Sequence, residues 1–407
     1  MLETNCLIGQ SGGPTAVINS SVLGILHATQ ETEKIDKIYG MKYGIKGILK
    51  GQIFDFNNTN KKEMELLRNT PSSILGSCRY KLDDYLNDDS NYIKIFAILA
   101  RLNIKYLFYI GGNDSMDTVN KLNNYAKEKS IDIKIIGIPK TIDNDLVGTD
   151  HCPGYGSAAK YIATSVMEIA RDSHVYDKKN VHVIEVMGRN SGWLAGASVL
   201  AQNDGLAAPD FIYLPEVAFN ISNFRKNIEE KLKEKKSVIA VVAEGVKNKY
   251  GEYICAAESS EHDIFGHKQM GGVASKLAYY IQNNICNRVK FIEFNVLQRS
   301  AAHCASGRDI KEAYICGKES VKSAIAGETG MMVGLERVEN SSYRCELKII
   351  KASEVANKEK QVPAKWINGQ GNGVTEEFKN YVLPLIQGDP EIYCEKGLPC
   401  FANLNII

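Results

Sequence analysis

Several short runs of apolar residues along the chain are each followed at once by glycine or by polar residues. These runs lie at 6–10, 105–110, 131–138, 181–186 and 237–243. Segments with helical apolar spacing follow several of them, for example Ile18, Val22 and Ile25 after the first. Continuous apolar runs predict strands that are buried on both faces, and their alternation with helices predicts βαβ units. We therefore expect an α/β fold with a parallel sheet.

The remaining pattern predicts two more helices, one more strand and two loops. The apolar stripes of the helices are Ala159, Ile162, Val166 and Ile169 in one and Val273, Leu277, Ile281 and Ile285 in the other. We interpret both stripes as core packing. The strand lies near 290–297, and the loops, rich in glycine and small residues, span 39–51 and 71–79.

The densest group of functional side chains follows the run at 131–138. It reads Pro139-Lys140-Thr141-Ile142-Asp143-Asn144-Asp145. Proline ends the strand because it lacks the amide hydrogen that the sheet needs. The carboxylates of Asp143 and Asp145 could divide two tasks, one accepting a proton and the other holding geometry or a metal ion. The alternative is an Asp/Asn-rich turn that caps the next helix.

Two glycine-rich turns between a strand and a helix are candidate anion sites. The first is Ser11-Gly12-Gly13-Pro14-Thr15, which opens a helix, and the second is Gly111-Gly112-Asn113-Asp114-Ser115, with a helix from about Met116. Backbone amides and the positive end of the helix favour an anion there. A plain tight turn is the alternative at the first site, which also lacks the GxGxxG of dinucleotide-binding folds. Asp114 suits a phosphate only if a divalent cation or a lysine lies between them.

Composition adds three bounds. The 407 residues suffice for about two domains, and a net charge of +1 gives no basic footprint, so nucleic acid is not an implied partner. No apolar run reaches membrane-spanning length, and the N-terminus lacks the pattern of a signal peptide. The 10 cysteines are irregularly spaced without a CxxC pair, which predicts reduced thiols in a cytoplasmic protein.

Taken together, these blocks resemble the phosphofructokinase family, and in particular its pyrophosphate-dependent members. The matching blocks lie between Ser11 and about Gly330, and the chief ones are Ser11-Gly12-Gly13, Gly111 to Ser115, Pro139 to Asp145, Met187-Gly188-Arg189, Glu244-Gly245, Phe265-Gly266-His267 with Gly271-Gly272, and Gln298-Arg299. The resemblance implies two Rossmann-like α/β lobes, with mainly parallel sheets flanked by helices and an active site in the cleft between them. The boundaries expected are 1–154 with about 298–345 for the phosphoryl-donor lobe, about 155–297 with 346–390 for the sugar-phosphate lobe, and 391–407 for a C-terminal tail.

The activity that the resemblance implies is reversible transfer of a phosphoryl group from pyrophosphate to the 1-hydroxyl of fructose 6-phosphate, with Mg²⁺. Asp143 would be the general base, Thr141 would hold the transferring group, and Arg189 would stabilise its charge. The donor site would be lined by Gly12, Gly13, Arg79, Asp114, Ser115 and Lys140. The sugar phosphate would be bound by Asp145, Met187, Gly188, Glu244, Lys290 and Arg299. From the residues alone, Arg79 could equally be surface charge.

Three positions depart from the family pattern. Asn113 stands where aspartate is usual, so Mg²⁺ would depend more on Asp114. Val296 replaces a histidine or tyrosine, and Asn180 replaces the basic residue that many members present from a neighbouring subunit. Lys290, Lys178 or Lys179 could supply that cation in a homodimer or homotetramer.

Two alternative functions remain open at this point. ATP-using relatives typically carry glycine at the positions of Asp114 and Lys140, so these two residues favour pyrophosphate over an ATP-dependent phosphofructokinase. A non-catalytic sugar-phosphate-binding subunit would be expected to lose the base or the phosphoryl clamp, yet Asp143 and Arg189 are present.

Overall fold

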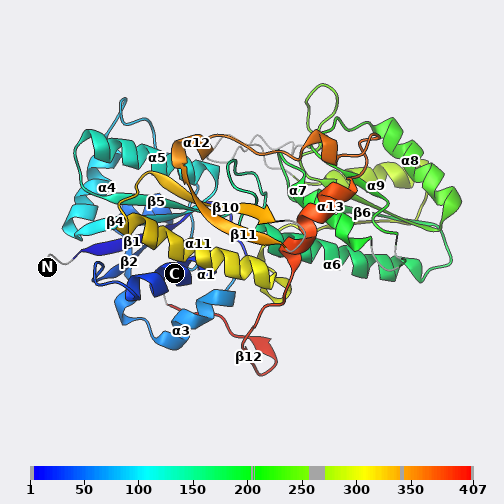
Figure 1. The fold of residues 1–407 in the computed structure, drawn as a ribbon. Coiled ribbons are helices and arrows are strands. Elements are labelled where there is room, and N and C mark those ends of the chain that lie inside the picture. The colour runs from blue at the N-terminus through cyan, green and yellow to red at the C-terminus, as the bar shows by residue number, and fades with distance from the viewer. Residues whose placement is uncertain (1–3, 203–204, 206, 256–270, 340–342, 405–407) are drawn as a thin grey trace. The chain divides into compact units, whose positions relative to one another are not determined.

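The apolar runs form the strands of two separate sheets, one in each of two units of the chain (Figure 1). Residues 4–202, 205, 207–255, 271–339 and 343–404 are described by the structure, a computed structural model. Unit 1 consists of Met1–Tyr155, Ser300–Glu359 and Gly388–Ile407, and unit 2 of Gly156–Arg299 and Lys360–Gln387. The expected α/β architecture with mainly parallel strands is confirmed in both units.

Unit 1 contains a seven-stranded sheet in the order β11-β10-β5-β4-β1-β2-β3. Its strands are β1 Asn5–Gln10, β2 Ile38–Met41, β3 Ile53–Asp55, β4 Ile104–Gly111, β5 Lys134–Pro139, β10 Met331–Glu339 and β11 Arg344–Lys351. The five central strands are parallel, and only β3 and β11, at the two edges, pair antiparallel with their neighbours. Polar loops that follow β1, β4 and β5 therefore leave the same edge of the sheet.

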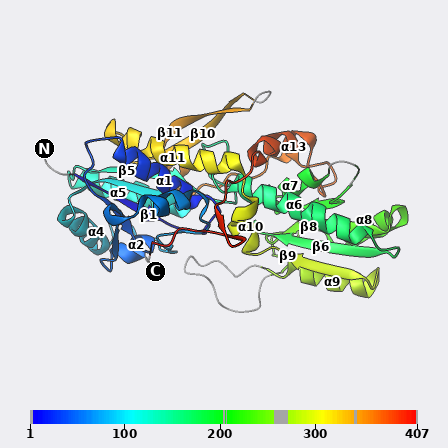
Figure 2. The same ribbon diagram turned by 90° about the horizontal axis from the view of Figure 1, so that it is seen from below.

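Helices cover both faces of this sheet (Figures 1 and 2). They are α1 Ile18–Gln30, α2 Gly44–Ile48, α3 Lys61–Leu66, α4 Ser90–Arg101, α5 Asn113–Glu128, α11 Gly307–Ile325 and α12 Ala352–Val355. Alternate strand residues point to opposite faces. Leu107 and Tyr109 of β4 pack with α4 and α5, whereas Phe108 and Ile110 pack with α1 and α11.

The helices α1 and α11 approach each other closely enough to exclude side chains at two positions. A Cβ atom at Gly24 would lie 2.1 Å from the carbonyl oxygen of Tyr314, and one at Gly317 would lie 2.1 Å from that of Ser21. Glycine is needed here because the two backbones are in contact. This packing fixes α11, whose first turns carry residues that contact the loop after β5.

Unit 2 contains a four-stranded parallel sheet in the order β7-β8-β6-β9. Its strands are β6 Asn180–Val186, β7 Phe211–Tyr213, β8 Ser237–Ala243 and β9 Val289–Glu293. Its main helices are α6 Tyr155–His174, α7 Trp193–Ala197, α8 Ile221–Glu234, α9 Val273–Asn284, α10 Leu297–Ser300 and α13 Glu376–Val382. Figure 2 shows the sheet lying between α6 and α9. Ile162 and Val166 of α6 and Leu277 and Ile281 of α9 are buried, so both stripes are core packing as predicted.

Four sequence-based expectations about elements were wrong. The segment 39–51 is not a loop throughout, because it holds the end of β2 and all of α2. The first helix begins at Ile18 and not at the glycines, and α5 begins at Asn113 and not at Met116. The strand near 290–297 ends at Glu293 and is followed by α10.

The boundaries of the two units also differ from those expected. Residues 346–359 cluster with unit 1, because β11 pairs with β10 along its whole length. The C-terminal segment holds a two-stranded hairpin of β12 Cys394–Glu395 and β13 Leu398–Pro399. That the two units are the donor and sugar-phosphate lobes stays a prediction.

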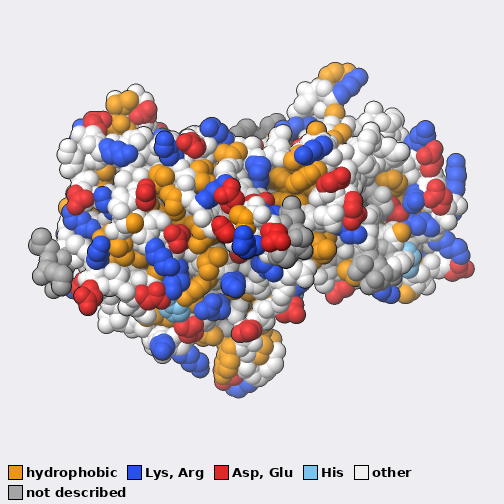
Figure 3. Space-filling view, viewed as in Figure 1, with side chains coloured by type: hydrophobic (Ala, Val, Ile, Leu, Met, Phe, Trp, Pro, Cys, Tyr) orange, Lys and Arg blue, Asp and Glu red, His pale blue; other side chains and the backbone are white. Residues whose placement is uncertain are grey.

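The surface carries both signs of charge. On the face drawn in Figure 3, lysine and arginine are interspersed with aspartate and glutamate. Among the described residues, no helix combines the length and the apolar character needed to cross a membrane.

Candidate active site

In unit 1 the loop after β1 packs against the loop 71–79, so Gly12 and Gly13 lie near Arg79. The amide of Gly12 donates to the carbonyl oxygen of Cys78 at 3.3 Å, and the hydroxyl of Ser77 donates to the carbonyl oxygen of Gly12 at 2.6 Å. Gly12 has a φ of +76°, which glycine adopts without strain. Because α1 begins only at Ile18, the predicted anion site at its first turn is not formed by these glycines.

The ammonium group of Lys140 lies over the same loop. The Nζ atom donates to the carbonyl oxygen of Gly13 at 2.7 Å, and a Cβ atom at Gly12 would lie 3.1 Å from it. Lys140 is only 3% exposed, so its side chain is not turned outward into solvent. A buried cation is stabilised by nearby negative charge, and this one is placed to attract an anion at the glycine loop.

The second glycine turn begins α5 directly. Gly112 is the residue before the helix, and Asp114 lies exposed in its first turn, where the helix dipole favours a carboxylate. Ser115 is buried against Gly111, since a Cβ atom at Gly111 would lie 1.9 Å from its hydroxyl oxygen. The side-chain amide of Asn113 donates to the Asp145 carboxylate at 3.2 Å, which links this turn to the loop after β5.

That loop holds Asp143 and Asp145 in a turn of its own. The amide of Asp143 donates to the Thr141 hydroxyl at 3.1 Å, and Asn144 is fully buried with a φ of +54°. Both aspartates are half-buried. The alternative of a helix cap is excluded, because the next helix begins only at Tyr155. A buried, backbone-fixed turn with two partly accessible carboxylates fits a reacting loop.

In unit 2 the residues after β6 and β8 lie side by side. The amide of Glu244 donates to the carbonyl oxygen of Val186 at 2.9 Å, and the amide of Gly245 donates to that of Gly188 at 3.2 Å. Gly188 has a φ of +138° and its amide faces the Glu244 carboxylate at 3.5 Å. Arg189 is half-buried, and its Nε atom has no hydrogen-bond partner among the described residues. An unsatisfied buried guanidinium nitrogen is costly in the free protein and is placed to bind an anion.

The short helix α10 adds Arg299 to this group. The buried side chain of Gln298 accepts a hydrogen bond from the Met187 amide at 3.2 Å and donates to the carbonyl oxygen of Asn295 at 3.0 Å. Gln298 therefore ties α10 to the end of β6, and the half-buried Arg299 follows it. Five of the predicted sugar-phosphate and catalytic residues thus lie at the carboxyl edge of the unit 2 sheet, where open α/β sheets bind ligands. They are Met187, Gly188, Arg189, Glu244 and Arg299.

A model of the family described as phosphofructokinase matches residues 5–291. A protein of Halomonas elongata named pyrophosphate–fructose 6-phosphate 1-phosphotransferase is 37% identical over 407 residues, covering 99% of this chain and 97% of that protein. One of the same name from Methylococcus capsulatus is also 37% identical, covering 99% and 96%. The crystal structure of a pyrophosphate-dependent phosphofructokinase from Marinobacter aquaeolei superposes with a TM-score of 0.89 at 34% identity, covering 98% of this chain and 96% of that one.

The chain belongs to the phosphofructokinase family. The fold and the family resemblance inferred from the sequence are therefore confirmed. The block Phe265-Gly266-His267 lies outside the described residues, and Gly271-Gly272 immediately precedes α9.

Lys290 is not part of the group that this phosphofructokinase chain forms at the carboxyl edge. Its strand, β9, pairs with β6 so that Lys290 lies opposite His182, toward the amino end of the sheet. Five residues separate His182 from Met187, which is roughly 16 Å along a strand. Lys290 lies 3.7 Å from Asp172 and is exposed. A role for it in sugar-phosphate binding therefore stays a prediction that requires a second subunit.

Asn180, which stands where many family members have a basic residue, is buried inside unit 2 and does not present a side chain to a neighbouring subunit. It is buried, its amide group donates to the carbonyl oxygens of Ser173 and Lys178, and its oxygen accepts from the Ser237 hydroxyl at 3.0 Å. These contacts hold it inside unit 2 at the start of β6.

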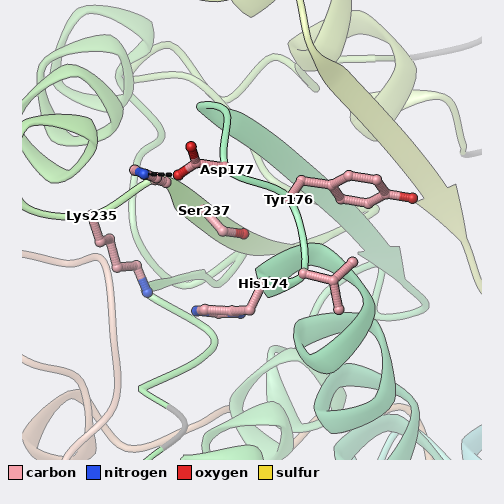
Figure 4. A pocket seen from close by; sticks show the side chains of 7 residues that line it. His174, Tyr176, Asp177, Lys235 and Ser237 are labelled. Carbon is pink, nitrogen blue, oxygen red and sulfur yellow. Dashed lines mark hydrogen bonds and ion pairs between the residues drawn. The ribbon is translucent and has the colours of Figure 1, made fainter.

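A pocket of about 420 Å³ lies at the amino edge of the same sheet, away from these residues. It is lined by His174, Val175, Tyr176, Asp177, Lys235, Lys236 and Ser237 (Figure 4). Both of its lysines are paired, Lys236 with Asp177 and Lys235 with the buried Asp210 at 2.6 Å. We do not assign the reaction to this pocket, because both of its lysines are paired with carboxylates and none of the candidate site residues lines it.

Sequence reasoning missed the contacts by which Gln298 and Asn113 link segments of the site that are distant in the chain. Gln298 contacts Met187 across 111 positions, and Asn113 links the α5 turn to Asp145 across 32. Both residues lie in blocks that resemble the family, but no sequence pattern indicated their hydrogen bonds.

Proposed function

We propose that this chain catalyses phosphoryl transfer from pyrophosphate to the 1-hydroxyl of fructose 6-phosphate, giving fructose 1,6-bisphosphate and phosphate, in a reversible reaction. The observation that carries the donor assignment is the buried ammonium of Lys140, 2.7 Å from the carbonyl oxygen of Gly13. A compact pyrophosphate anion at the glycine loop would be neutralised by this cation. ATP would have to place its α-phosphate near Asp114, a carboxylate, where like charges repel.

The roles of the remaining residues follow from the chemistry of phosphoryl transfer, in which positioning and charge neutralisation supply most of the catalysis. Asp143 is the base that takes the proton of the sugar hydroxyl, and Thr141 holds the turn in which Asp143 lies. Arg189 stabilises charge on the transferred group, and the Nε atom of its guanidinium has no hydrogen-bond partner among the described residues. The other donor-side residues are Gly12, Gly13, Arg79, Asp114 and Ser115, and the sugar-side residues are Asp145, Met187, Gly188, Glu244 and Arg299.

The donor side has the oxygen ligands that Mg²⁺ prefers. Asp114 is an exposed carboxylate, and the Oδ1 atom of Asn113 beside it is buried without a hydrogen-bond partner within the described part of the chain. Mg²⁺ is usually held by one or two carboxylates together with substrate phosphates and waters. The described residues contain no group of three acidic, histidine or cysteine side chains suited to a metal ion, so the substrate would supply several ligands. When bound, the ion would neutralise charge on the phosphates.

We further propose a cytoplasmic homodimer or homotetramer. All ten cysteines are free thiols, which suits a reducing compartment. A neighbouring subunit would add a cation beside Arg299 for the sugar 6-phosphate, since Asn180 is buried and Lys290 lies away from Arg299 within one chain.

A coupled assay with fructose 6-phosphate, Mg²⁺ and either pyrophosphate or ATP tests the proposal. We expect turnover with pyrophosphate far above that with ATP, and formation of pyrophosphate in the reverse direction. The Asp143→Asn variant, prepared identically, controls for a contaminating kinase. Equal or better activity with ATP in the unmodified protein would refute the donor assignment, and no activity with either donor would favour the non-catalytic alternative.

A further inference from the structure

The two ends of the loop between Thr141 and Gly154 are hydrogen-bonded to each other, so the residues near Gly154 help to fix the residues near Thr141. The amide of Thr141 donates to the carbonyl oxygen of Pro153 at 3.2 Å, and Thr141 pairs with Gly154 as an isolated bridge. Within this ring the side-chain oxygen of Asn144 accepts from the amide of Cys152 at 3.0 Å. Because Asn144 lies between Asp143 and Asp145, a shift of Cys152 would move both aspartates through this hydrogen bond.

His151, which precedes Cys152, joins the loop to α11. It is 1% exposed, with Nδ1 2.8 Å from the Asp150 carboxylate and Nε2 2.7 Å from the Glu312 carboxylate. A neutral imidazole has one N–H and can donate to only one of these acceptors. Both short contacts are satisfied together only by the doubly protonated ring. Glu312 lies in α11, which the glycine contacts with α1 hold in place.

The two carboxylates are themselves fixed by other side chains. The Tyr343 hydroxyl donates to the second oxygen of Glu312 at 2.7 Å, and Arg337 donates to Asp150 at 3.1 Å. The charged or titratable groups around His151 come from the loop, from α11 and from the β10–β11 hairpin. They are Asp150, Cys152, Arg308, Asp309, Glu312, Cys316, Arg337, Tyr343 and Cys345.

These neighbours keep the ring charged near neutral pH. Burial alone would lower the pKa of His151, but the carboxylates of Glu312 and Asp150 outweigh it and raise the pKa to about 9. Burial would likewise raise the pKa of Glu312, but the contacts with His151 and Tyr343 lower it below its usual value. Burial holds the pKa of Tyr343 well above its ordinary range, so Tyr343 stays a neutral donor.

We propose that His151 is a positioning residue, whose doubly protonated ring clamps the loop that carries Asp143 and Asp145 onto Glu312 of α11. A second contact supports the same attachment, since the amide of Gly154 donates to the Asp309 carboxylate at 2.9 Å. The proposal rests on the proposed function, because it treats Asp143 as the base. Loss of the proton from His151 would break one of the two clamping bonds and loosen the loop without removing any group that touches substrate.

The test compares wild type with Glu312→Gln, which keeps the shape of the side chain but removes its charge and one of its two acceptor oxygens, and with His151→Gln. His182→Gln is the matched control, because His182 is equally buried, its pKa is lowered to about 4 by burial, and it lies in β6. Two readouts are taken: the pH profile of kcat with pyrophosphate, and amide hydrogen exchange of the peptide spanning residues 141–155.

We expect His151→Gln to lower kcat by about 10- to 100-fold with little change in KM, as for a misplaced catalytic group. In Glu312→Gln the alkaline fall of kcat should move at least about one pH unit lower, because an opposing charge has been removed from His151. Exchange over 141–155 should quicken in both variants and stay unchanged in His182→Gln.

Unchanged exchange over 141–155 in both variants, or an alkaline limb that does not move in Glu312→Gln, would overturn the proposal. A purely structural role would lower the stability of the protein and leave that limb in place. If the wild type proved inactive with pyrophosphate, the proposed function would fail, whereas the exchange comparison would still decide whether His151 clamps the loop.

Discussion

We predict that the choice of phosphoryl donor depends most strongly on Lys140. Its side chain is 3% exposed, whereas Asp114 is exposed in the first turn of α5. Two unit charges about 4 Å apart interact by about 4 kcal/mol at an effective dielectric of roughly 20, but by only about 1 kcal/mol in bulk water. Removing the charge of Lys140 should therefore lower kcat/KM for pyrophosphate by a large factor. Removing the charge of Asp114 should raise kcat/KM for ATP by a smaller factor.

The variant Lys140→Met keeps the length of the side chain and removes its charge. We expect kcat/KM for pyrophosphate to fall about a thousandfold, since each ~1.36 kcal/mol is tenfold. Lys140→Gly should also weaken pyrophosphate turnover. Asp114→Gly should raise kcat/KM for ATP about fivefold, because solvent screens the repulsion between Asp114 and the α-phosphate to about 1 kcal/mol.

The measurement is initial-rate kinetics at saturating fructose 6-phosphate and Mg²⁺, with pyrophosphate and ATP each varied. Lys121→Met is the matched control, because Lys121 lies in α5 of the same unit, pairs with Asp117 at 2.7 Å and donates to the carbonyl oxygen of Leu82 at 2.8 Å, and is not a candidate donor-site residue. That control should keep the wild-type kcat/KM. A Lys140→Met enzyme that retained kcat/KM for pyrophosphate within about threefold of wild type would refute the reasoning.

Three further results are expected. Asp143→Asn should lower kcat in both directions by about 10²–10⁴-fold, and near-normal turnover would remove Asp143 as the base. Light scattering should show at least a homodimer, and a fully active monomer would contradict this. Because the folded-state pKa of His151 is raised from 6.5 to about 9, its contribution to stability is complete below pH 6.5 and is lost as pH rises through 9. Urea unfolding should thus show a loss of about 3 kcal/mol in the free energy of unfolding above pH 9 that His151→Gln lacks.

Strands that are buried on both faces were predicted from the sequence almost to the residue. The runs at 6–10, 105–110, 181–186 and 237–243 correspond to β1, β4, β6 and β8 within one residue at each end, whereas the run at 131–138 begins three residues before β5. Such strands carry an unbroken apolar signal because helices cover both faces of the sheet. The strand β2 gave no such signal, since its four residues include Tyr39 and Gly40 and it owes its conformation to parallel pairing with β1.

Helix starts and unit boundaries were less well predicted, because both depend on contacts distant in sequence. The turn after β1 packs on Cys78 before α1 begins, and no local residue pattern reports that packing. Likewise β11 belongs to unit 1 through its pairing with β10, although the chain continues from there to unit 2.

The α/β class, the family and the chemical types of the candidate site residues could be predicted from the sequence, because glycine turns, carboxylates and cations at the ends of apolar strands are local features. The tertiary structure decided where those groups point. In the structure Lys140 is buried beside Gly13, and Lys290 lies toward the amino end of the unit 2 sheet, away from Arg299. Glu312 contacts His151 although 161 positions separate them in the chain. Hydrogen bonds and burial between segments that are distant in sequence create these arrangements, and a residue pattern read along one strand or loop does not contain them.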